Sequence, residues 1–102
     1  MRACGEELWV CGSPPVAAVG LEPEGAALRI ARLMVAPSAQ RRGLGRAAVA
    51  LAIRRAEGRD VVVSTGELNA PALALYEGAG FERTGARTVP GVRIADLRRA
   101  AS

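Results

Sequence analysis

The sequence predicts one α/β (α+β) domain with a mixed, mostly antiparallel sheet and two helices, in the order β-β-β-α-β-α-β-β. Short apolar runs separated by glycine and proline turns occupy both ends of the chain and are typical of antiparallel hairpins. In the middle, helix-like segments alternate with apolar runs, and a strand, helix, strand succession requires a parallel crossover. Since 102 residues bury one modest core, we expect a single domain over residues 1–102.

The strands are predicted from runs of β-branched and other apolar residues that turn residues bound. The run 26–35 has apolar side chains on both of its faces, which favours a central strand. The predicted strands are residues 8–11, 16–21, 26–35, 61–63, 81–84 and 92–97, and a helical tail is the alternative for the last of them.

Both predicted helices have ends that the sequence marks. An alanine- and leucine-rich segment over residues 44–56 stops before Gly58, which suits a helix C-terminus. The second helix begins after Asn69, a good N-cap, carries Pro71 in its first turn and ends at Gly80.

The composition excludes several kinds of chemistry. The chain has no His, which excludes imidazole-based triads and His-rich metal sites. All 14 basic residues are Arg, which excludes a Schiff-base lysine and the lysine of a P-loop. Cys4 and Cys11 are two lone thiols with no secretory leader ahead of them, and no apolar stretch is long enough to cross a membrane. We therefore expect a soluble cytoplasmic protein that needs neither a metal nor a membrane.

The net charge of +4 is concentrated in the middle of the chain. Residues 1–28 carry a net −3, residues 29–59 a net +7, and residues 60–102 are balanced. Such a focused positive region favours an anionic partner, either a phosphorylated small molecule or nucleic acid, and the alternative is a solvated helix face. The chain has one Trp, one Tyr and one Phe for base stacking, which argues against nucleic acid.

A basic, glycine-bearing loop between a strand and a helix is the candidate anion site. Its glycines let a ligand approach the backbone, and the helix start offers unpaired N–H groups at the positive end of the dipole. The run 43–48 also satisfies the dinucleotide fingerprint G-x-G-x-x-G/A, with Glu67 as a candidate ribose ligand. That alternative is disfavoured, because the first glycine does not directly follow the strand and the strands are too few for a doubly wound sheet.

Two motifs follow one another along the chain with a predicted strand between them. Gln40-Arg41-Arg42-Gly43-Leu44-Gly45 has the form Gln/Arg-x-x-Gly-x-Gly/Ala, and the segment from Asn69 to Phe81 has the form N-x-x-A-x-x-L-Y-x-x-x-G-F. Together these motifs resemble the pyrophosphate loop and the following helix of the GNAT superfamily of acyl-CoA-dependent N-acetyltransferases, over residues 8–84.

The resemblance implies acetyl-CoA as a cosubstrate. In this family the strand before the loop and the strand after the helix splay apart, and the pantetheine arm lies between them. The implied contacts are main-chain ones on the first strand, with an N–H for the thioester oxygen, and main-chain N–H groups and charge around the pyrophosphate. The implied cofactor-binding residues are Leu33, Met34, Val35, Gln40, Arg41, Arg42, Gly43, Leu44, Gly45, Arg46, Asn69 and Tyr76.

Tyr76 matches the family tyrosine that stands near the sulfur, and it is the implied catalytic residue. A phenol with a pKa of about 10 is a suitable acid toward a departing thiolate. The alternative role of Tyr76 is to fill the core together with Leu73. The implied reaction is acetyl transfer, in which a neutral amine attacks the thioester directly and CoA leaves.

The general base is a departure from the family pattern. Family members often place a Glu on the strand before the loop, but Arg29 and Ala31 occupy the matching positions. Candidate substitutes are Glu67, Glu22 and Glu24, and an amine of low pKa would need no base.

A second departure from the family pattern concerns the acceptor pocket. Family members usually carry a further strand and two helices before the strand that corresponds to residues 8–11, and those helices wall off the acceptor pocket. We expect this strand and helix pair to be missing here. One interpretation is an enzyme whose groove is open or completed by another subunit of a homodimer. The other is a truncated, catalytically inactive CoA-binding or interaction module. The acceptor would be the amine of a small molecule or of a peptide.

Overall fold

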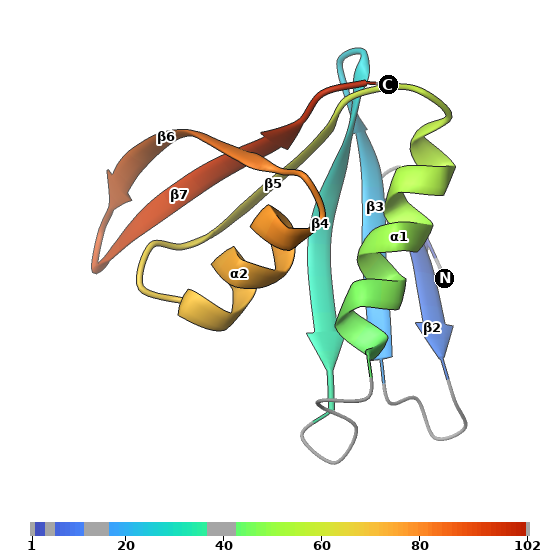
Figure 1. Cartoon of the computed structure of the whole chain (residues 1–102), viewed down its shortest axis with the longest axis horizontal. Helices are drawn as coiled ribbons and strands as arrows, with labels where there is room; N and C mark the ends of the chain where they lie inside the picture. Colours follow the sequence, from blue (N-terminus) through green and yellow to red (C-terminus); the bar gives the residue numbers. More distant parts are fainter. Residues whose placement is uncertain (1, 4–5, 12–16, 37–42, 102) are drawn as a thin grey trace.

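The computed structural model describes residues 2–3, 6–11, 17–36 and 43–101. Within these residues the chain forms seven strands and two helices, whose arrangement Figure 1 shows. In chain order they are β1 Arg2–Ala3, β2 Glu6–Cys11, β3 Ala17–Glu24, β4 Ala27–Val35, α1 Leu44–Ala56, β5 Val61–Gly66, α2 Ala70–Gly78, β6 Glu82–Val89 and β7 Val92–Arg99.

All seven strands belong to one sheet, in the order β1-β2-β3-β4-β5-β7-β6. Every neighbouring pair is antiparallel except β4 and β5, which are parallel and are joined through α1. The predicted mixed, mostly antiparallel sheet is confirmed, and β4 lies at its centre as predicted. The last predicted segment is strand β7 and not a helical tail, and the two-residue strand β1 is an addition to the predicted order.

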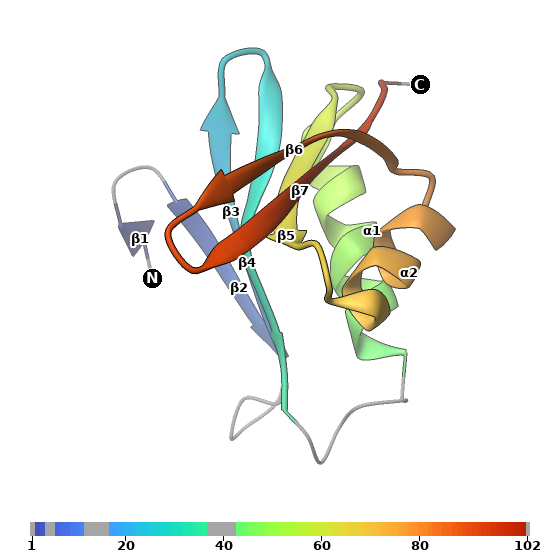
Figure 2. The ribbon, with the colours of Figure 1, turned by 90° about the vertical axis from the view of Figure 1, so that its left-hand side faces the viewer.

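Both helices cover the same face of the sheet, as Figure 2 shows. The core lies between that face and the helices, where α1 contributes Val49 and Ala52 and α2 contributes Tyr76. The sheet contributes apolar side chains from β3, β4, β5 and β7, among them Leu21, Ile30, Val63 and Leu97. No helix in the described ranges is both long enough and apolar enough to span a membrane.

A β-bulge lies at the centre of β4, next to the point where β4 separates from β5. In the register with β3, Leu21 is opposite Ile30 while Gly20 is opposite Arg32, so Ala31 is an extra residue in β4. Such a bulge bends the strand that carries it. The register of β4 with β5 ends at the pair Ile30 and Val63, just before the bulge. Beyond that pair the two strands diverge as a fork, which is visible in Figure 1.

Candidate functional site

The end of β4 that has diverged from β5 borders a cleft of about 940 Å³. Its walls are the last residues of β4, the first turn of α1 and one side of α2. The lining residues are Leu33, Met34, Val35, Gly43, Leu44, Gly45, Arg46, Pro71, Ala72 and Leu75.

The start of α1 presents backbone N–H groups without an intrahelical partner at the mouth of this cleft. Gly43 has φ 75° and ψ 11°, a left-handed conformation that glycine adopts without steric cost, and it turns the chain into the helix. The first intrahelical bond runs from the N–H of Ala47 to the carbonyl of Gly43, at 2.9 Å. The N–H groups of residues 44–46 precede it, and α1 has neither a side-chain cap nor an acidic residue in its first turn. Together with the exposed Arg46, this end of the helix is suited to a phosphate.

Gly45 allows α1, α2 and β4 to approach one another closely. A Cβ atom at this position would lie 3.3 Å from Cδ2 of Leu75 and 4.0 Å from Cγ2 of Val35. Because Gly45 has no side chain, α1 can pack closely against Leu75 of α2 and Val35 of β4, and both of these residues keep their places in the wall of the cleft.

The end of β4 supplies the backbone wall of the fork. Leu33, Met34 and Val35 pair with β3 on one side, through the register Leu33 to Val19, Met34 to Ala18 and Val35 to Ala17. Because N–H and C=O groups along a strand point alternately to its two edges, part of the polar backbone of this segment faces the open fork.

Two of the remaining predicted site residues, Asn69 and Tyr76, are described by the structure, and neither is among the residues that line the cleft. Asn69 caps α2: its Oδ1 accepts from the N–H of Ala72 at 3.2 Å, and its Nδ2 donates to Oγ1 of Thr65 at 3.4 Å. Tyr76 has 4% of its surface exposed and is a core residue, its ring centroid 5.5 Å from that of Phe81. Burial raises the pKa of the Tyr76 phenol. Gln40, Arg41 and Arg42 lie outside the described residues.

Two of the candidate bases are engaged in ion pairs. The Glu24 carboxylate accepts hydrogen bonds from Arg29, which lower its pKa. Glu67 Oε1 lies 3.1 Å from Nε of Arg93. Over the described ranges, no group of three or more potential metal ligands comes together.

Sequence reasoning missed the contribution of α2 to the cleft. Pro71, Ala72 and Leu75 line it, and they lie inside the motif that named Asn69 and Tyr76. The signal was their helical spacing, because residues 71 and 75 are one turn apart on the same face.

Comparisons with known proteins agree with this architecture. Residues 4–81 match the acetyltransferase (GNAT) family. The Escherichia coli ribosomal-protein-S18-alanine N-acetyltransferase superposes with a TM-score of 0.85 and 22% identity, over 99% of this chain and 72% of that one. An IAA acetyltransferase from Bacillus cereus gives a TM-score of 0.81 and 21% identity, over 93% of this chain and 77% of that one.

A third similar structure was solved with a ligand. A Bacillus subtilis acetyltransferase in complex with CoA gives a TM-score of 0.84 and 18% identity, over 96% of this chain and 78% of that one. At these identities the superpositions establish the fold alone. No curated protein sequence matches the chain significantly.

Proposed function

The chain belongs to the GNAT acetyltransferase family, and on that basis we propose that it transfers an acetyl group from acetyl-CoA to an amine of a small molecule or a peptide. The observation that carries the proposal is the cleft between the diverging end of β4, α1 and α2, with the start of α1 at its mouth. A thioester cofactor with a phosphorylated end suits this combination of a cleft and an anion site.

The described residues suit CoA in their polarity. The cleft of about 940 Å³ has apolar walls from Val35 and Leu75, and the start of α1 with Arg46 lies beside them. We assign the pyrophosphate to the N–H groups of residues 43–46 and to the charge of Arg46. Residues 40–42 precede them directly and are part of the same proposal. The backbone of residues 33–35 would bind the pantetheine arm, and Asn69, the cap of α2, is proposed to contact it as well.

When bound, acetyl-CoA supplies an acyl group whose C–S bond is replaced by a bond to the acceptor nitrogen. Tyr76 is the proposed proton donor for the departing thiolate. Tyr76 lies in the core next to the cleft residue Leu75 and does not itself line the cleft, so the proposal requires the phenol to reach the sulfur when acetyl-CoA is bound. Because burial raises the pKa of its phenol, Tyr76 keeps its proton at neutral pH. The acceptor must enter as a neutral amine. Glu24 and Glu67 are ion-paired, which leaves Glu22 on β3 as a candidate base or an acceptor amine of low pKa that needs none.

A thermal unfolding experiment with acetyl-CoA tests the cofactor assignment. At a ligand concentration of a hundred times Kd, binding adds about 2.7 kcal/mol to the free energy of unfolding, which raises Tm by on the order of 10 °C for a domain of this size. We expect Arg46→Glu to reduce this shift. The matched control Arg83→Glu, on the exposed strand β6, makes the same charge change away from the cleft and should keep the shift. A wild-type Tm that saturating acetyl-CoA leaves unchanged would contradict the proposal.

A second candidate function is CoA binding without catalysis. It is favoured by Arg29 in place of the strand carboxylate and by the burial of Tyr76 in the core. Release of free thiol from acetyl-CoA with a panel of amines and amino-terminal peptides separates the two functions. Turnover on any amine supports the transferase and eliminates the inactive module.

A further inference from the structure

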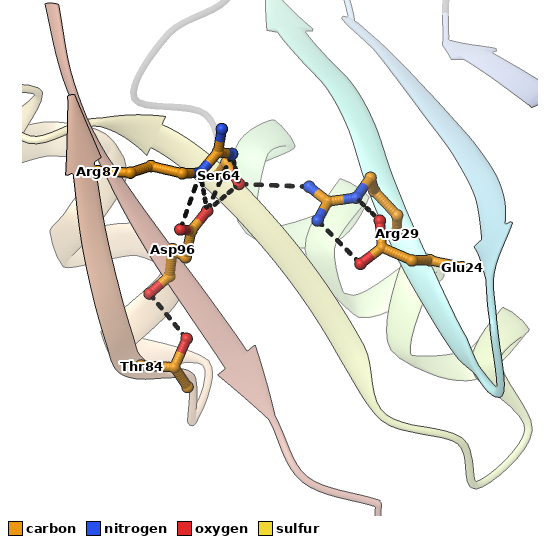
Figure 3. Close-up of polar contacts among 6 residues, drawn as sticks. All are labelled: Glu24, Arg29, Ser64, Thr84, Arg87 and Asp96. Atoms are coloured by element: carbon orange, nitrogen blue, oxygen red, sulfur yellow. Dashed lines mark hydrogen bonds and ion pairs between the residues drawn. The ribbon is translucent and has the colours of Figure 1, made fainter. Parts of the chain in front are cut away.

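The face of the sheet opposite the helices carries a row of polar side chains that crosses five strands (Figure 3). We call this row the transverse belt, and its members are Glu24 on β3, Arg29 on β4, Ser64 on β5, Asp96 on β7 and Arg87 on β6. Along their strands Arg29, Ser64 and Asp96 are next to core residues, so their side chains leave the sheet on the other face.

The belt is one unbroken series of hydrogen bonds. Arg29 donates from Nε and Nη2 to the Glu24 carboxylate, the second bond at 3.0 Å, and from Nη1 to Oγ of Ser64 at 3.3 Å. Ser64 donates to Oδ1 of Asp96 at 2.5 Å. Arg87 donates to both Asp96 oxygens, at 3.0 Å and 3.1 Å, and to Oγ of Ser64 at 3.3 Å.

Ser64 is the centre of this arrangement. A hydroxyl has one donor and two acceptor positions, and here Asp96 takes the first while Arg29 and Arg87 take the other two. A hydroxyl with all three positions occupied has one orientation. Its contacts therefore hold the Ser64 side chain between the β4 half of the sheet and the β7–β6 half.

Ser64 lies at the point where β4 and β5 begin to diverge. The register of β4 with β5 ends at the pair Ile30 and Val63, so Ser64 is the first residue of β5 in the open fork. The hydrogen bond from Arg29 thus links the two halves of the sheet one residue beyond the last backbone pair. Ion pairs as exposed as those of Glu24 and Arg87 contribute little to folding stability, because water screens them.

We propose that the transverse belt sets the angle at which β5 leaves β4 and, because α2 follows β5 and forms one wall of the cleft, also the width of the cleft. Arg29 and Ser64 are then positioning residues for the pantetheine arm. This inference rests on the proposed function, because the cleft is the proposed CoA site. The belt acts on the fork, whereas the phosphate contacts belong to the start of α1. A change in the belt therefore alters the binding of the pantetheine arm and spares that of the nucleotide.

The test compares two ligands, CoA and adenosine 3′,5′-bisphosphate, which lacks the pantetheine arm. Dissociation constants are measured by calorimetry for wild type, Ser64→Ala and the conservative Ser64→Thr. We expect Ser64→Ala to weaken CoA binding by roughly three- to tenfold and to leave the affinity for the bisphosphate within about twofold of wild type. Ser64→Thr keeps the hydroxyl and should bind CoA as wild type does.

Two further variants complete the design. Thr88→Val removes a hydroxyl on the β6–β7 hairpin that accepts a hydrogen bond from Arg93 outside the belt, and it should change neither affinity. Arg87→Met removes the hydrogen bond from Arg87 to Oγ of Ser64, at an exposed position outside the core. Like Ser64→Ala, it should weaken the binding of CoA and spare that of the bisphosphate.

Equal CoA affinities of wild type, Ser64→Ala and Arg87→Met would overturn the belt and leave the proposed function standing. A parallel loss of affinity for both ligands would also overturn it, because the effect would not be confined to the fork. A wild-type protein that does not bind CoA would overturn both.

Discussion

The close approach of α1 to α2 at Gly45 leads to a prediction that couples stability to ligand binding. Replacing Gly by Ala inside a helix ordinarily adds about 0.5–1 kcal/mol to the free energy of unfolding, because the unfolded chain loses conformational freedom. At Gly45 the new methyl would lie 3.3 Å from Cδ2 of Leu75. Carbon atoms prefer separations of about 3.5–4.0 Å, so Leu75 must move by a few tenths of an ångström.

The size of the effect follows from two opposing contributions. Overpacking costs about 1–3 kcal/mol when neighbours cannot move, but Leu75 is only half-buried and borders the cleft, so it has room on one side. We expect Gly45→Ala to lower the free energy of unfolding by about 0–2 kcal/mol once the gain from helix entropy is included. The displaced Leu75 side chain then narrows the cleft and weakens the binding of CoA.

Gly78 offers a matched control for Gly45. It lies in α2 and has no atom within 4 Å of the position that a Cβ would take. Gly78→Ala should therefore show the ordinary gain without the contact. Urea denaturation with and without CoA measures both variants, and the reasoning is refuted if Gly45→Ala is stabilised as much as Gly78→Ala and binds CoA with an unchanged Kd.

Three other predictions concern the core and the charged groups. Tyr76→Phe should keep the stability of the protein, since the ring is the part that packs, and should lower kcat by about a hundredfold or more if the phenol donates the proton; a kcat equal to that of wild type assigns Tyr76 to the core alone. The pKa of Asp96 is lowered in the folded protein, first by the hydrogen bond from Arg87 and then by that from Ser64. The stability that ionised Asp96 contributes is therefore complete above the pKa of the unfolded chain, and it is lost as the pH falls through the lower pKa of the folded state. Because the ion pair between Asp96 and Arg87 is open to solvent, we expect only a small decline of Tm below about pH 4, and a smaller one in Asp96→Asn; equal declines would contradict the assignment. Leu97→Ala, at a side chain with 1% exposure, should cost about 2–5 kcal/mol in urea denaturation, and a loss under about 1 kcal/mol would show that the core closes around the gap.

How far the fold could be predicted depended on whether an element carries its own signal. Helix α1 was predicted with its observed bounds, because an Ala- and Leu-rich stretch and the glycines beside it mark both ends locally. Strand β6 was predicted only to residue 84 but continues to Val89. Its residues from Glu82 to Thr88 are exposed, so no apolar alternation marks them, and pairing with β7 is what makes them a strand.

The candidate site shows the same division between local and distant information. The end of β4, the loop and the start of α1 are consecutive in sequence, so one motif indicated one whole side of the cleft. The transverse belt draws its residues from five strands, with Arg29 and Ser64 separated by 35 positions. No spacing rule connects such residues, because their proximity is produced by the order of the strands in the sheet.

Several arginines of the positive middle segment, residues 29–59, already have partners within the protein. Arg29 is ion-paired with a glutamate, Arg59 donates to the carbonyls of residues 55 and 56 at the end of α1, and Arg55 lies 5.3 Å from the centre of an indole ring. Each of these has a partner in the protein, whereas Arg46 lines the cleft beside the uncapped helix start. Three of the eight arginines of residues 29–59 are therefore already engaged within the protein. CoA binding should accordingly weaken with salt as expected for a few charge contacts, and much less steeply than the binding of a polyanion.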